Sequence, residues 1–227
     1  MFNLFGKRQK DEVSQIKDDL TRMYFEEYKK QYPKLPFDSL LKMANYKSEW
    51  ERDTERLKEK DVLNTIKKLD LPKTISDLFC KNEESKRIGL NNYLRCPTEF
   101  FLMTKKEQDA YNVENIIPFL SDISFYKIYA YDKKKNGFLT FDIEMPEPNI
   151  NESSQRFTWD GLFVSDILFW WECEIENNKI IEFGKALQLN WTREIIDSIE
   201  SKLDNSKTEN ITKWKNSIYK KYQMMKE

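Results

Sequence analysis

The strongest constraint on the fold is the Asn136-Gly137 pair, which separates two short runs rich in β-branched and aromatic residues, 126–131 and 138–144. Asn-Gly favours a tight hairpin turn because both residues tolerate the positive φ angles that such a turn requires. A third run of the same kind, 116–120, comes just before them. The sequence therefore predicts an antiparallel meander across about 115–145.

Helical patterns lie on both sides of this meander. Apolar residues recur at spacings of three and four in 11–31, in 37–69 and in the tail, 191–203 and 208–226. The 37–69 stretch contains a break that the pattern does not place, and Pro72 begins a shorter helix that runs to Phe79. We interpret 81–97 as a polar loop, 98–103 as a strand or a helix, and 104–110 as a helical turn or loop.

The segment 157–176 fits two structures. Phe163, Ile167, Trp170 and Trp171 have the spacing of a buried helix, whereas Trp171, Cys173 and Ile175 alternate with glutamates as in a strand. In the second case Asn177-Asn178 would turn the chain into a hairpin. We favour a helix over 160–171 followed by an extended piece.

These patterns predict an α+β fold, with a twisted antiparallel sheet flanked by helices and with helical N- and C-terminal segments. We expect residues 1–70 to be a helical N-terminal extension and 71–227 to be the α+β core with its C-terminal helices. One compact unit overall is the alternative.

The 227 residues include no histidine. This excludes Ser-His-Asp triads, Cys-His dyads and histidine-containing zinc sites. The three cysteines, Cys80, Cys96 and Cys173, have no metal-binding or redox spacing and suit a reducing compartment. No apolar run is long enough for a signal peptide or a membrane span. We therefore expect a cytoplasmic protein with no catalytic residues, no cofactor and no membrane partner.

The charge is unevenly distributed, although the net charge of the chain is only −1. This balance gives no overall attraction to nucleic acid. Residues 140–185, however, hold 10 acidic and 3 basic side chains, a net charge of −7. A solvated surface is one interpretation, and a negative patch that attracts a basic partner is another. The predicted partner-binding residues are Asp142, Glu144, Glu147, Glu152, Glu172, Glu174 and Glu176.

A metal-dependent carboxylate site is a third interpretation of the same segment. Asp142 and Glu144 would share one face of a strand, because residues two apart point the same way. Two-metal nucleases also use a nearby lysine, but Glu144 is followed by Met145-Pro146-Glu147. We therefore predict no metal site and keep a carboxylate-dependent phosphodiesterase as the alternative function.

Residues from about 70 to 175 resemble the SUKH superfamily of Smi/Knr-like proteins. Leu71-Pro72 is similar to the family's opening of a short helix, and Ile117-Pro118-Phe119 with Asp122 is similar to its strand entry. Tyr131-Asp132 resembles the end of the following strand, and 157–171 resembles the closing helix. The family's glycine-containing loop after the first helix has no glycine here, where 81–85 stands in its place.

The resemblance implies an α+β sheet fold and a binding role. Many bacterial members resemble immunity proteins that neutralise a secreted toxin, often a nuclease or a deaminase. The leading hypothesis is thus a non-enzymatic, immunity-like protein that binds a basic toxin through its acidic segment. The alternatives are the carboxylate-dependent metal enzyme and a regulatory protein-interaction module, and the oligomeric state is left open.

Overall fold

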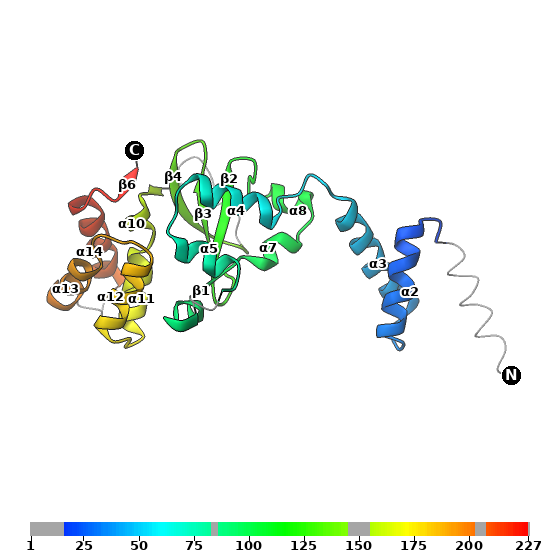
Figure 1. Ribbon diagram of the computed structural model, residues 1–227, viewed down its shortest axis with the longest axis horizontal. Helices are drawn as coiled ribbons and strands as arrows, with labels where there is room; N and C mark the ends of the chain where they lie inside the picture. The colour runs from blue at the N-terminus through cyan, green and yellow to red at the C-terminus, as the bar shows by residue number, and fades with distance from the viewer. Residues whose placement is uncertain (1–15, 83–85, 145–154, 203–207, 227) are drawn as a thin grey trace. The chain divides into compact units, whose positions relative to one another are not determined.

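The computed structural model describes residues 16–82, 86–144, 155–202 and 208–226 (Figure 1). Contacts divide the chain into two units. The smaller comprises residues 1–56 together with 102–105, and the larger comprises 57–101 and 106–227. The sequence analysis predicts a boundary after residue 70, whereas the two units divide after Arg56.

The smaller unit is built on two packed helices, α2 (Asp19–Gln31) and α3 (Phe37–Arg52). The Asp18 side chain caps α2 by accepting a hydrogen bond from the Thr21 N–H at 2.7 Å. The core of the pair consists of four buried apolar residues: Ile16, Phe25, Leu40 and Ala44.

The break predicted within 37–69 lies between α3 and α4 (Glu59–Lys68). Asp53 ends α3 and organises the turn, because its carboxylate accepts hydrogen bonds from the N–H groups of Arg56 at 3.1 Å and Lys105 at 2.5 Å. Helix α4 begins after Arg56, where the chain divides, and so it belongs to the larger unit.

The larger unit contains a six-stranded antiparallel sheet in the order β1-β2-β3-β4-β5-β6. Its central strands are β2 (Ile116–Asp122), β3 (Lys127–Asp132) and β4 (Gly137–Asp142), which confirm the predicted meander. Asn136 has a φ of 48° in the β3–β4 turn, but Gly137 has no positive φ and already begins β4. The turn therefore comprises the four residues 133–136, and it is not the tight turn with two positive φ angles that Asn-Gly predicts. The two-residue strands β1 (Leu94–Arg95), β5 (Arg156–Phe157) and β6 (Met225–Lys226) complete it.

The two faces of the sheet have different coverings, because alternate residues of a strand point to opposite sides. On one face, Phe141 packs against Tyr111, and α4 and α5 (Lys73–Phe79) contact β2. On the other face, Tyr129 stacks on Phe163 and Phe138 packs against Trp159. Trp159 begins α10 (Trp159–Leu162), and Phe163 links it to α11 (Val164–Glu172).

The described part of the predicted polar loop 81–97 is not entirely a loop, since it holds the short 3-10 helix η1 (Leu90–Asn92) and strand β1. The stretch 98–103, which the sequence left open, is helical in α7 (Thr98–Leu102), and α8 (Lys105–Asp109) follows. Gln108 is fully buried and holds this region by donating to the carbonyls of Leu57 at 3.1 Å and Phe100 at 3.2 Å.

The C-terminal helices α12 (Asn177–Ala186), α13 (Thr192–Lys202) and α14 (Thr208–Lys221) stand beside α11 (yellow to red in Figure 1). The helix predicted over 160–171 is confirmed, but the extended piece and the hairpin alternative after it are wrong. Residues 177–186 are helical because Ile180, Phe183 and Gly184 form one buried face. No helix of the described segments is both long and apolar enough to cross a membrane.

Among the described residues of the larger unit, five helices end in the same way, with a non-glycine residue in the left-handed conformation. In each, two backbone N–H groups bond back to the last turn in the Schellman pattern. The left-handed residues of α4, α5, α11, α12 and α14 are Asp70, Lys81, Glu174, Gln188 and Gln223, with φ between 49° and 58°. Glycine is the usual residue at this position because it has no Cβ to clash with the backbone.

Candidate functional site

Three predicted partner-binding residues come together where α11 turns into α12. Glu172, Glu174 and Glu176 are all exposed, and we call them the acidic turn. They border a surface hollow of ≈ 520 Å³, whose wall also includes Trp171 and Ile175. The hollow therefore combines negative charge with apolar surface, which suits the alkyl stem and the charged end of a lysine or arginine.

The acidic turn is held by the Schellman motif at the end of α11. The N–H of Glu174 donates to the carbonyl of Trp171 at 3.0 Å, and the N–H of Ile175 donates to the carbonyl of Trp170 at 3.1 Å. Glu174 has a φ of 58°. Trp170 is buried against Phe183 of α12, with ring centroids 5.2 Å apart, so the backbone below the carboxylates is firmly anchored.

Two further predicted residues lie at the end of strand β4. Asp142 is half-buried, and one of its carboxylate oxygens accepts a hydrogen bond from the N–H of Glu144 at 2.8 Å. Glu144 itself is exposed. Glu147 and Glu152 lie outside the described residues. The predicted acidic residues thus form two groups, one at the sheet end and one at the acidic turn.

Two lysines stand between these groups. Lys127 is the register partner of Asp142, and its ammonium contacts Asp166 of α11 at 2.6 Å. Lys215 of α14 lies within electrostatic reach of Lys127, Asp166 and Glu172. Burial and the neighbouring Lys127 lower the pKa of Lys215. The negative residues of 140–185 therefore do not form one uninterrupted surface.

Asp166 is the centre of a buried polar cluster that the sequence analysis counted only as surface charge. Its side chain is 9% exposed, and one oxygen accepts hydrogen bonds from Lys127 and from the Tyr129 hydroxyl, both at 2.6 Å. Burial, reinforced by the Asp166 charge, raises the pKa of Tyr129 well above its ordinary value, so the phenol remains a donor. A lone Asp in the apolar run 163–171 was the signal for this buried ion pair.

The three cysteines differ in their exposure. Cys80 and Cys173 are exposed and Cys96 is buried. Burial raises the pKa of the Cys96 thiol to about 12, which keeps it protonated and unreactive at neutral pH. Among the described residues, no three or more Cys, Asp or Glu side chains gather as metal ligands would.

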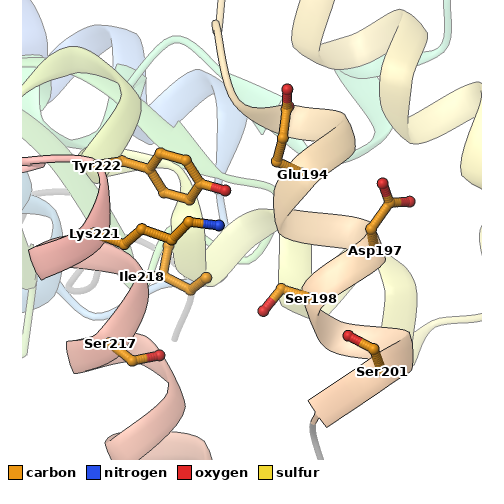
Figure 2. Close-up of a pocket in the computed structure, with 8 residues that line it drawn as sticks. All are labelled: Glu194, Asp197, Ser198, Ser201, Ser217, Ile218, Lys221 and Tyr222. Atoms are coloured by element: carbon orange, nitrogen blue, oxygen red, sulfur yellow. The ribbon is translucent and has the colours of Figure 1, made fainter.

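A second hollow, of ≈ 350 Å³, separates α13 from α14 (Figure 2). Glu194 and Asp197 come from α13, and Lys221 and Tyr222 face them from the α14 side, as Figure 2 shows. Trp191 stacks on Tyr222 with ring centroids 4.6 Å apart. The walls carry charges of both signs, so we interpret this hollow as a solvated crevice between two helices.

The comparisons with known proteins do not identify this chain. No protein-family model matches it, and no curated protein or solved structure does either. The similarity to the SUKH superfamily therefore stays a prediction from the sequence.

Proposed function

We propose that this chain is a non-enzymatic binding protein that receives a basic protein partner, as an immunity protein receives the toxin it neutralises. The observation that carries the proposal is the acidic turn, in which three exposed carboxylates surround a hollow with aromatic and aliphatic walls. Like-charged groups on the lining of one hollow repel one another, and a cationic partner relieves that repulsion.

The acidic turn supports recognition more than tight affinity. Exposed carboxylates speed the encounter with an oppositely charged partner and orient it, and salt screens their effect over about 8 Å. The lysines beside Asp166 restrict the attraction to two places, the acidic turn and the sheet end. A partner with two separated basic clusters fits this arrangement better than one with a single broad basic face. We also propose that the protein acts in the cytoplasm.

The test measures association of the full chain with the product of the adjacent reading frame, if that product is a secreted protein with a basic toxin domain. We expect the double variant Glu172→Lys, Glu174→Lys to associate about tenfold more slowly at low salt, and the difference to shrink at high salt.

A matched control reverses two exposed glutamates of the smaller unit, Glu49→Lys and Glu55→Lys, which lie outside the acidic turn. Equal effects from the two double variants would show that only total charge matters. Association rates that do not change with ionic strength would contradict the proposal.

A further inference from the structure

Two large apolar side chains project from the loop between β2 and β3. Ile123 is 49% exposed and Tyr126 is 52% exposed. The backbone N–H of Ile143 donates to the carbonyl of Tyr126 at 2.9 Å, which brings the 142–144 segment alongside this loop. We call Ile123 and Tyr126 the apolar tip.

The loop is held rigidly in this conformation. The carboxylate of Asp122 accepts hydrogen bonds from the Ser124 hydroxyl at 2.5 Å and from the Lys127 N–H at 3.2 Å. Phe125 has a φ of 65°, and the guanidinium of Arg95 lies over its ring. A bulky residue in the left-handed region is strained, and such strain persists only where the surroundings enforce it.

Negative charge borders the apolar tip on the side of β4, and the positive charge of Arg95 over Phe125 is accompanied by the carboxylates of Glu99 and Asp122. Asp142 and Glu144 flank Ile143, and the ammonium of the nearby Lys127 is directed to Asp166, 2.6 Å away. Protein interfaces commonly place a rigid aromatic or aliphatic anchor at the centre and charged groups at the rim. A rigid anchor also binds at a smaller entropic cost, because little freedom remains to be lost.

We propose that the apolar tip anchors the basic partner, and that the partner presents there an apolar side chain flanked by lysine or arginine. This inference rests on the proposed function and adds a second contact to it. The acidic turn would steer the partner by charge, whereas the tip would hold it by burial of apolar surface.

The experiment titrates the isotopically labelled full chain with two synthetic peptides, Lys-Lys-Leu-Lys-Lys and Lys-Lys-Gly-Lys-Lys, and follows backbone amide shifts by NMR. We expect the leucine peptide to bind about fivefold more tightly, because its side chain is partly buried on the tip. Its additional shifts should fall on 122–126 and 142–144.

Variants separate the anchor from the charge. Tyr126→Ala and Ile123→Ser should each abolish the preference for leucine while leaving the glycine peptide unaffected. The control Tyr32→Ala removes a similarly exposed tyrosine of the smaller unit and should preserve the preference. Because Ile123 and Tyr126 are exposed, thermal melting should show both variants folded.

The outcomes distinguish the two proposals. Equal affinity of the peptides, or a leucine preference that survives in both tip variants, would overturn the anchor and leave the acidic turn standing. If the double variant Glu172→Gln, Glu174→Gln binds both peptides as tightly as the wild type does, the proposed charge-based function is wrong. The preference for the leucine peptide then decides separately whether the apolar tip is an anchor. The absence of any binding at millimolar peptide would overturn both.

Discussion

Replacing Glu174 with glycine should stabilise the fold while weakening the binding of a cationic partner. Glu174 occupies a left-handed position with a φ of 58°, which costs a residue with a Cβ about 1–2 kcal/mol. Glycine removes this cost but loses about 0.5–1 kcal/mol through the greater freedom of the unfolded chain. The net expectation is a stabilisation of about 0.5–1 kcal/mol.

Gln188 provides the matched control. It ends α12 with a φ of 53° and the same pair of backbone hydrogen bonds, 3.1 Å from its own N–H and 2.8 Å from that of Leu189. Gln188→Gly should therefore give the same stabilisation without altering charge. For a chain of this size, either substitution should raise the melting temperature by about 1–4 °C.

The assay combines urea unfolding, followed by circular dichroism, with titration of an octalysine peptide at low salt. We expect both variants to be more stable and only Glu174→Gly to bind the peptide more weakly. If Gln188→Gly stabilises and Glu174→Gly does not, the Glu174 side chain makes a favourable contact that offsets its strain. If both variants lose stability, the reasoning about these helix ends is wrong.

Three further predictions follow from buried groups. Asp132→Asn should cost about 3–5 kcal/mol, because it leaves Arg156 without its carboxylate in a buried pair 2.8 Å apart; urea unfolding would show no such loss if the pair were inconsequential. Burial by itself raises the pKa of Asp132, but the hydrogen bonds from the Lys135 N–H and the Arg156 guanidinium together outweigh burial, so the native pKa lies below that of the unfolded chain. This stabilisation is present above about pH 4 and is lost as the pH falls through the native pKa, so the wild-type advantage over Asp132→Asn should shrink in acid. A thiol reagent should label Cys80 and Cys173 quickly and Cys96 only on unfolding; rapid labelling of all three would contradict the burial of Cys96. Gly184→Ala should destabilise by about 1–3 kcal/mol, measured by thermal melting, because its Cβ would overlap Thr192, and an unchanged melting temperature would show that α12 and α13 separate easily.

The central sheet could be predicted because its signals are local. The runs on either side of residues 133–136 have the composition of strands, and the turn between them depends only on neighbouring residues, with Asn136 in the left-handed conformation. Strands β1, β5 and β6 were missed because two residues cannot display a period. Their pairing depends on neighbours that are distant in the chain, as when Phe157 faces both Phe138 and Met225.

The candidate site was predictable only in part. The sequence identified Glu172, Glu174 and Glu176 by charge, but their alternation with apolar residues suggested a strand. The sequence did not predict the end of α11, because Glu174 occupies the left-handed position at which glycine usually marks a helix C-terminus. The lysines that separate the acidic groups could not be foreseen, because Lys127 and Lys215 reach Asp166 only through tertiary packing.

The short return of residues 102–105 into the smaller unit means that this unit is not continuous in sequence. The Tyr46 hydroxyl donates to the Leu102 carbonyl at 3.3 Å, and Asp53 holds the N–H of Lys105. A fragment ending at residue 56 would lack both of these contacts. The complete smaller unit therefore needs residues 102–105, which are supplied only by a chain that continues into the larger unit.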